Sequence, residues 1–190
     1  MTTFLPSHPH SDQRGYTLIE VFIAIGLMAV LVTLGAFGLR NYWYVQSLDS
    51  GTDEAVSQLR QLQERVVSES HPLVYGARFR KGSPDYALVV YDPRAVAPTP
   101  MCTQDGQIRS FDRGSMSASI QVSTSTTAVP DSAEATACRA ELSGVTAADV
   151  FVFFYARGSA TAGTIRLEQT NLNRGENIVI TGLTGRVERT

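Results

Sequence analysis

The sequence has few basic residues and no excess of them. Its 190 residues include 16 Lys and Arg against 18 Asp and Glu, for a net charge of -2, and Lys81 is the only lysine. The basic residues do not cluster along the chain, whereas binding to nucleic acid or to anionic lipid normally relies on such a cluster. The composition therefore carries no signature of a nucleic-acid-binding protein.

Histidine and cysteine are scarce as well. The histidines are His8, His10 and His71, and the cysteines are Cys102 and Cys138. Two cysteines cannot complete a four-ligand zinc site, and no histidine pair lies near them in the sequence. His71 forms no recognisable motif with a Ser or Cys nucleophile, and no Gly-rich phosphate-binding loop opens a helix. We therefore predict no enzyme, no metal site and no cofactor.

The chain does contain one long apolar run, from Tyr16 to Leu39, in which Glu20 is the only charged residue. As a helix, a run of this length would extend about 36 Å, enough for a hydrocarbon core of about 30 Å. A cleaved secretory signal has an apolar core of only about 7 to 15 residues. Tyr42-Trp43-Tyr44 follow the run, and such rings favour the headgroup level. The run is therefore predicted to span a membrane.

The residues that open this run are Arg14-Gly15-Tyr16-Thr17-Leu18-Ile19-Glu20. They resemble the processing site of the prepilin family, which comprises type IV pilins and the pseudopilins of type II secretion. The resemblance implies that a prepilin peptidase cuts between Gly15 and Tyr16, and that the new N-terminus at Tyr16 is methylated. Glu20 is then the fifth residue of the processed chain, where the family has a glutamate. Tyr16 departs from the usual phenylalanine of the family.

The resemblance also implies a location and partners. The chain would cross the inner membrane once, with its leader in the cytoplasm and its C-terminal domain outside, and would then join other pilins in a pilus or pseudopilus. Charge alone orients the helix poorly, because Arg14 and Arg40 flank the run on both sides. An independent membrane-anchored binding domain is a different class of protein, and it would keep its leader uncut.

Glu20 needs a partner if it lies in hydrocarbon. An ionised carboxylate there costs about 2.5 to 3.5 kcal/mol on insertion scales. In a filament, the amine at Tyr16 of a neighbouring subunit could pair with it, which would make Glu20 a register device for assembly. In the alternative, Glu20 reaches the cytoplasmic headgroups and pairs with nothing.

Beyond the aromatic residues, apolar side chains recur every three or four positions, which is typical of an amphipathic helix. The helix is predicted to continue to about Ser70 and to end at His71-Pro72. We expect an α+β fold in which a long N-terminal helix, membrane-spanning in its first half, packs against an antiparallel β-sheet C-terminal domain. The expected divisions are a leader (1–15), a transmembrane or filament-core helix (16–40), its amphipathic continuation (41–71) and a β-rich globular head (72–190).

Six short segments of the head are predicted to be strands, because they are rich in β-branched and aromatic residues and are separated by turn residues. They are residues 73–79, 86–91, 117–122, 150–155, 164–169 and 177–181. The first two should form a hairpin, and Arg174-Gly175 should form a turn. Residues 93–114 and 123–140, rich in Ala, Ser, Thr and Pro, are predicted to be surface loops. One or two antiparallel sheets packed on the helix would result.

Cys102 and Cys138 lie in the part of the chain that the resemblance places outside the cytoplasm, where cysteines are commonly oxidised. Two cysteines in such a compartment most simply make one disulfide. Closing a loop of about 37 residues would stabilise the fold by roughly 3 to 4 kcal/mol. We predict that this disulfide joins the two loops.

The end of the chain is punctuated by glycine: Phe153, Phe154, Arg157-Gly158, residues 163–167 and 178–180, and Gly185-Arg186-Val187. This stretch is similar to the tail of H-type minor pseudopilins and of related type IV minor pilins. With the N-terminal resemblance, it implies a minor subunit rather than the main building block of a fibre.

We therefore predict a minor type IV pilin-like structural subunit that is processed by prepilin peptidase and is incorporated into, or primes, a pilus or pseudopilus. One alternative is a minor pseudopilin of type II secretion. Another is a competence pilin that binds DNA for uptake, although the net charge does not favour it. Its phosphate contacts would be Arg157, Arg166, Arg174, Arg186 and Arg189.

Overall fold

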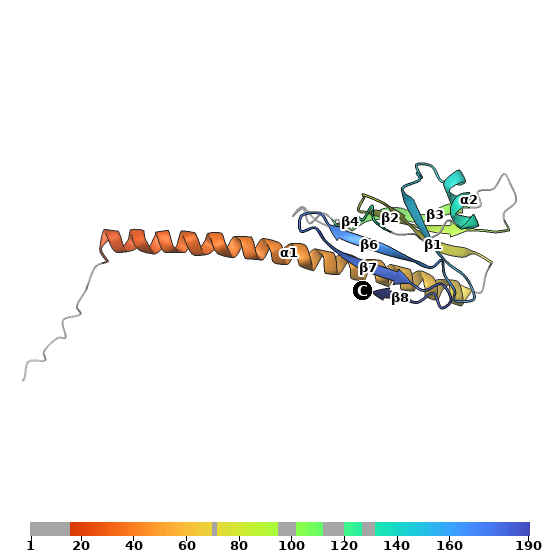
Figure 1. Ribbon diagram of the computed structural model, residues 1–190, viewed down its shortest axis with the longest axis horizontal. Helices are drawn as coiled ribbons and strands as arrows, with labels where there is room; N and C mark the ends of the chain where they lie inside the picture. The colour runs from red at the N-terminus through yellow and green to blue at the C-terminus, as the bar shows by residue number, and fades with distance from the viewer. Residues whose placement is uncertain (1–15, 70–71, 95–101, 112–119, 127–131) are drawn as a thin grey trace, which may run out of the picture. The chain divides into compact units, whose positions relative to one another are not determined.

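The computed structural model describes residues 16–69, 72–94, 102–111, 120–126 and 132–190. The chain divides into two compact units, one up to Arg40 and one comprising Asn41–Thr190, which we call the head unit. Figure 1 shows the elements in chain order: α1 (Leu18–Glu69), β1 (Val74–Arg80), β2 (Asp85–Tyr91), β3 (Cys102–Ser110), β4 (Ile120–Val122), α2 (Ala133–Glu141), β5 (Asp149–Phe154), β6 (Gly163–Gln169), β7 (Arg174–Ile180) and β8 (Val187–Arg189).

Helix α1 runs through 52 residues and belongs to both units. Its apolar first half leaves its large side chains exposed, whereas its second half buries one face. The buried residues recur at the helical spacing predicted from the sequence: Tyr44, Leu48, Gly51, Thr52, Ala55, Val56, Leu59, Leu62 and Val66. The prediction of one long helix followed by an antiparallel β domain is confirmed. The predicted stop at His71 lies outside the described residues.

The head unit contains two four-stranded antiparallel sheets, with strand orders β3-β2-β1-β5 and β4-β6-β7-β8. The predicted hairpin is present, with Val74 opposite Tyr91 and Phe79 opposite Tyr86. An isolated parallel bridge between Lys81 and Val122 connects the hairpin turn of the first sheet to β4 of the second. The two sheets therefore meet at this corner.

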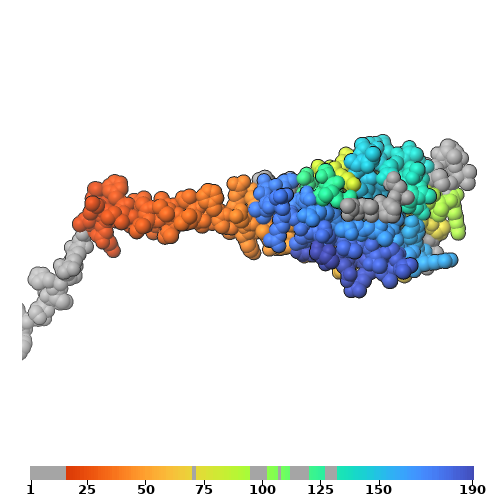
Figure 2. Space-filling view, viewed as in Figure 1, coloured from red at the N-terminus to blue at the C-terminus, as the bar shows by residue number. Residues whose placement is uncertain are grey.

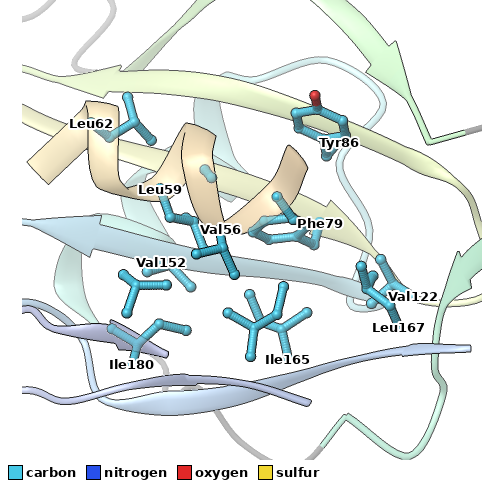
Figure 3. Close-up of a cluster of buried hydrophobic side chains, with 14 of the residues drawn as sticks. Val56, Leu59, Leu62, Phe79, Tyr86, Val122, Val152, Ile165, Leu167 and Ile180 are labelled. Carbon is cyan, nitrogen blue, oxygen red and sulfur yellow. The ribbon is translucent and has the colours of Figure 1, made fainter. Parts of the chain in front are cut away.

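The main core lies between the second half of α1 and one face of each sheet. Leu59 of α1 is 0% exposed and belongs to this core together with Phe79 and Val152 of the first sheet and Ile165 and Ile180 of the second (Figure 3). On the face shown in Figure 2, residues of β6, β7 and β8 (blue) form much of the head surface in front of α1. Burial of the α1 stripe therefore depends on both sheets.

A smaller apolar cluster covers the other face of the first sheet. It contains Phe151 and Phe153 of β5, Ala135 of α2 and the two cysteines. Strand β5 is consequently buried on both faces. Gly76 on β1 is needed for this packing, because a Cβ there would lie 2.5 Å from the Phe153 ring and 2.6 Å from the Val152 carbonyl oxygen. Real Cβ atoms do not approach other groups so closely.

Several predictions about the loops were wrong. Residues 102–110 form β3 rather than a loop, because β2 pairs with them along most of their length. Residues 133–141 form α2, whose N-terminus Ser132 caps by accepting a hydrogen bond from the Ala135 N–H. Arg174-Gly175 opens β7 instead of forming a turn, since these residues pair with the end of β6. Strand β8 had not been predicted. Of the predicted strand at 117–122, residues 117–119 lie outside the described residues.

Candidate assembly site

The N-terminal end of α1 is organised by Thr17. Its carbonyl oxygen accepts hydrogen bonds from the N–H groups of Glu20 (3.0 Å) and Val21 (3.3 Å), and its hydroxyl oxygen lies 3.4 Å from the Glu20 N–H. Thr17 and Glu20 thus have the spacing of a capping box, a signal that can be read from sequence and that our prediction had overlooked. The helix begins directly after the predicted cut, and Glu20 stands in its first turn, where the helix dipole favours a carboxylate.

Tyr16 and Glu20, the residues predicted to act in processing and assembly, are both exposed, Tyr16 to 81%. Gly15, on the other side of the predicted cut, lies outside the described residues. The only hydroxyl deeper in the apolar run belongs to Thr33, which donates to the Ala29 carbonyl at 2.7 Å. The helix pairs its own backbone groups, and the Thr33 hydroxyl is already hydrogen-bonded. Glu20 is therefore the single charged group on this surface.

By length and composition, α1 is the one helix in the described part of the chain that could cross a membrane. Its most apolar window has a mean hydropathy of 2.5, and none of that window is buried. The large apolar side chains from Leu18 to Leu39 are 47 to 76% exposed. Such an area of exposed apolar surface is unstable in water, so this segment requires lipid or other apolar helices around it.

The end of the chain is held against α1 by Arg189 of β8. Its guanidinium forms ion pairs with Asp49 and Asp53 of α1 and with Glu176 of β7, at 2.9 Å from Asp53 and 2.6 Å from Glu176. The hydrogen bond to Glu176, followed by those to the two aspartates, raises the pKa of Arg189. Three carboxylates from two elements therefore converge on one cation.

Two further side chains of α1 bind the backbone just before this residue. Arg60 donates to the Val187 carbonyl oxygen and Gln63 to the Thr184 carbonyl oxygen, each at 3.0 Å. We call these contacts, together with the Arg189 ion pairs, the C-terminal clasp. The clasp fixes the lengthwise position of β8 against the second half of α1.

Near its C-terminal end, α1 is tied to the first sheet by Arg65. This guanidinium pairs with Glu69 and with Asp105 of β3, each at 2.8 Å, and its Cζ lies 4.5 Å from the centre of the Tyr75 ring. The Tyr75 hydroxyl donates to Glu69, and burial together with this carboxylate raises the pKa of Tyr75. One turn of α1 is thereby attached to β1 and β3.

Asp149 at the start of β5 is a fully buried carboxylate, at 0% exposure. It accepts hydrogen bonds from Arg80 Nε (3.2 Å) and from the Thr146 backbone N–H (2.6 Å), and the Arg78 guanidinium lies 4.0 Å away. The Asp149 carbonyl accepts from Arg139 of α2 at 3.1 Å. Because a buried charge is tolerated only when it is paired and hydrogen-bonded, this group has a structural role.

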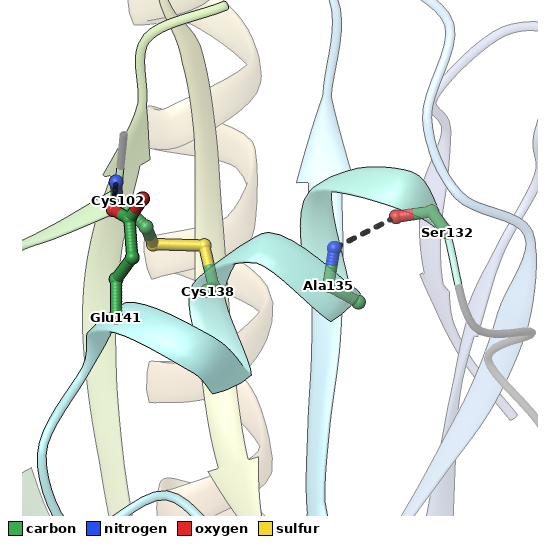
Figure 4. The surroundings of a disulfide bond; sticks show 5 residues. All are labelled: Cys102, Ser132, Ala135, Cys138 and Glu141. Atoms are coloured by element: carbon green, nitrogen blue, oxygen red, sulfur yellow. Dashed lines mark hydrogen bonds between the residues drawn. A yellow bond between two sulfur atoms is a disulfide. The ribbon is translucent and has the colours of Figure 1, made fainter. Parts of the chain in front are cut away.

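The predicted disulfide between Cys102 and Cys138 is present and joins the first residue of β3 to α2 (Figure 4). Both cysteines are buried. The N–H of Cys102 donates to Glu141 Oε2 at 2.7 Å, so the strand and the helix are joined by a hydrogen bond as well as by the disulfide. Among the described residues, no group of three or more His, Cys, Asp or Glu could hold a metal ion.

The five arginines predicted for DNA contact do not act alike. Arg166 pairs with Glu168 at 3.1 Å, Arg186 pairs with Glu188 at 2.6 Å, and Arg189 belongs to the clasp. Arg174 opens β7, whereas Arg186 follows the opposite end of that strand. Three of the five are therefore already neutralised by carboxylates, and the set spans the length of a strand.

Residues 10–36 match the family model of the prokaryotic N-terminal methylation motif. The match includes the predicted cut site and most of the apolar run, and it confirms the prepilin-type N-terminus predicted from residues 14–20. No curated protein sequence matches the chain significantly. Among solved structures, the type IV minor pilin FimU of Pseudomonas aeruginosa is similar to this chain, with 15% identity over 76% of this chain and 89% of that one, and a TM-score of 0.45.

Proposed function

Because residues 10–36 carry the prokaryotic N-terminal methylation motif, we propose that the chain is a minor pilin-like structural subunit rather than an enzyme. A prepilin peptidase cuts between Gly15 and Tyr16 and methylates the new N-terminus. The subunit is first held in the inner membrane by α1, with the head unit outside the cytoplasm. It then joins other pilins or pseudopilins in a filament.

The observation that carries this proposal is the exposed apolar surface of α1 directly after the predicted cut, most of which lies within the motif. This surface is stable in only two surroundings, the bilayer before assembly and a bundle of similar helices after it. Glu20 is the one charged group that must be accommodated in both. In the bundle, the methylated amine of a neighbouring Tyr16 offers the opposite charge. Removal of one partner would strand the other, at a cost of about 3 to 5 kcal/mol if that charge is fully buried.

The first test is the N-terminus of the membrane-extracted chain, determined by mass spectrometry in cells with and without the prepilin peptidase. A chain that begins with N-methylated Tyr16, and only when the peptidase is present, is the expected result. An intact Met1, or a cut beyond Leu34, would overturn the proposal and leave an anchored or secreted β domain.

A second test addresses the role of Glu20 after processing. Glu20→Ala is expected to be cut normally and to be depleted from isolated filaments, whereas Glu20→Asp keeps the charge and serves as the matched control. Normal incorporation of Glu20→Ala would favour a carboxylate that only reaches the headgroups. Co-purification of the filament with a secretion system or with a pilus motor would then assign the subunit to a pseudopilus or a pilus.

A further inference from the structure

The head unit closes the outer edges of its sheets with its own groups. On β5, the Phe153 N–H donates to the Thr161 hydroxyl oxygen (2.6 Å), and the Phe153 carbonyl accepts from the Thr161 N–H (2.9 Å). On β4, the Val122 N–H donates to the Ser83 carbonyl (3.0 Å), and the Val122 carbonyl accepts from the Gly82 N–H (2.7 Å). Unpaired edge groups attract other strands, and at these positions they are already used.

Strand β8 is closed in a different way. It has three residues, and its Val187 carbonyl accepts from Arg60 of α1. Short edge strands of this kind are poor templates for another chain. The remaining edge strand, β3, has nine residues and is by far the longest of the four edges. It therefore carries the greatest risk of unwanted pairing.

Glu141 protects the outer edge of β3 from pairing, because its side chain binds a backbone N–H of that edge. Cys102 lies opposite Tyr91, yet its N–H donates to Glu141 Oε2 rather than to β2. Backbone groups of successive residues point to opposite sides of an antiparallel strand, so those of residues two apart point to the same side. The N–H groups of Cys102 and Gln104 therefore both point away from β2, and the Glu141 carboxylate occupies the first of these two positions.

Glu141 is held in place by the disulfide. It follows Cys138 by three residues on α2, so the covalent bond fixes this end of the helix beside the strand that it guards (Figure 4). A β-bulge further along β3 also disfavours pairing at this edge. The register shifts opposite residues 86–88, and Gly106 has a φ of +88°. The Gly106 carbonyl accepts a hydrogen bond from Gln104 Nε2 at 3.1 Å. Bulges and inserted charges are known means of protecting an edge.

We propose that the outer edge of β3 is a latent interaction surface for β3 of a second copy of this chain, and that Glu141 keeps it closed. Every copy presents the same edge, and two such edges can pair antiparallel about a two-fold axis. Asp105 and Arg109 give the described part of the strand no net charge, so two copies of it do not repel each other. This inference rests on the head unit alone and does not depend on the proposed function.

The test uses the full chain in detergent micelles, with self-association followed by analytical ultracentrifugation. Glu141→Ala is expected to associate about tenfold more tightly than the unmodified chain, the factor that corresponds to one hydrogen bond to a charged group. Glu141→Gln retains an acceptor oxygen and should behave like the unmodified chain. Both variants keep α1 unchanged, so association through that helix is common to all samples.

A double variant separates edge pairing from general loss of structure. Proline at residue 104 removes an N–H that points outward, and proline is tolerated at such edge positions. Glu141→Ala combined with Gln104→Pro should therefore return to the association of the unmodified chain. Association that persists in this double variant would overturn the proposal, and so would Glu141→Ala that associates no more than the unmodified chain.

Hydrogen exchange on the unmodified chain provides a measurement without any substitution. The Cys102 amide, bound by Glu141, should exchange slowly, and the Gln104 amide should exchange faster. A slowly exchanging Gln104 amide in a sample that already forms dimers would mean that the edge is paired and not guarded, which would contradict the proposal.

Discussion

Removal of the disulfide should cost the head unit a large part of its stability. The bond between Cys102 and Cys138 spans a sequence separation of 36 residues. In the chain-entropy model, closure of a loop of this size reduces the entropy of the unfolded chain enough to stabilise the fold by roughly 4 kcal/mol. Many small domains have a total free energy of unfolding of only about 5 to 15 kcal/mol. Cys102→Ala combined with Cys138→Ala is therefore expected to remove a large fraction of it.

The assay is urea unfolding of the full chain in detergent, followed by near-ultraviolet circular dichroism and analysed by linear extrapolation. The double variant should lose about 3 to 4 kcal/mol, and its dependence on urea should steepen, because the unfolded chain without the bond is more expanded. Chemical reduction of the unmodified chain is the matched control and should lower stability in the same direction. A loss below about 1 kcal/mol would refute the reasoning, since the entropy of the open loop would then be unimportant.

Three further outcomes follow from the packing and the charges. Leu59→Ala should lower the free energy of unfolding by about 3 kcal/mol, because a cavity is left between α1 and both sheets. Val67→Ala, at a position 52% exposed on the same helix, should change the free energy of unfolding by less than about 0.5 kcal/mol. Equal effects of the two substitutions in urea unfolding would contradict the assigned core. Arg189→Ala should cost about 1 to 2 kcal/mol at low ionic strength and less in concentrated salt, so a loss that is independent of salt would argue against the ion pairs. Burial, together with the hydrogen bond to Glu54, raises the pKa of Tyr86 to about 12. Since the unfolded tyrosine ionises at about pH 10, the stability that this group contributes should be complete below that pH and should be lost between about pH 10 and 12. Thermal unfolding across this range should show a smaller decline for Tyr86→Phe, and an unchanged decline would remove Tyr86 as its source.

The elements predicted correctly are those in which local periodicity and tertiary burial agree. The α1 stripe has a helical spacing because one face of the helix is buried, and β1 and β2 are apolar because the first sheet is covered on both faces. Strand β3 was missed because its sequence, Cys-Thr-Gln-Asp-Gly-Gln-Ile-Arg-Ser, has little β propensity. It is a strand because β2 pairs with it and because the disulfide holds its first residue. Neither cause is visible in a local window of sequence.

The same distinction applies to the candidate site. The apolar run and the disulfide were predicted correctly because they depend on residues whose chemistry is evident from type and order, whereas the cut position stays a prediction. The Thr17 cap could have been predicted, because a threonine three residues before a glutamate is a known helix start. The Ser132 cap of α2 was also readable, although the Ala and Ser content of that stretch had favoured a loop. The contacts that Arg189, Arg60 and Gln63 make between α1 and the end of the chain could not be predicted, since they join residues more than a hundred positions apart.

The C-terminal clasp has a consequence for the order of events during synthesis. Its contacts between α1 and the end of the chain join residues separated by 121, 127 and 140 positions, so the head unit depends on long-range contacts. Such folds form slowly, because the ends of long loops must meet before the contacts are made. The second half of α1 is synthesised early, but its polar flank receives Arg189 only when the last strand has been made and, in the proposed topology, has reached the same side of the membrane. In that topology the head unit should complete its folding after translocation, and any protein that delivers the chain must keep the apolar stripe of α1 covered until then.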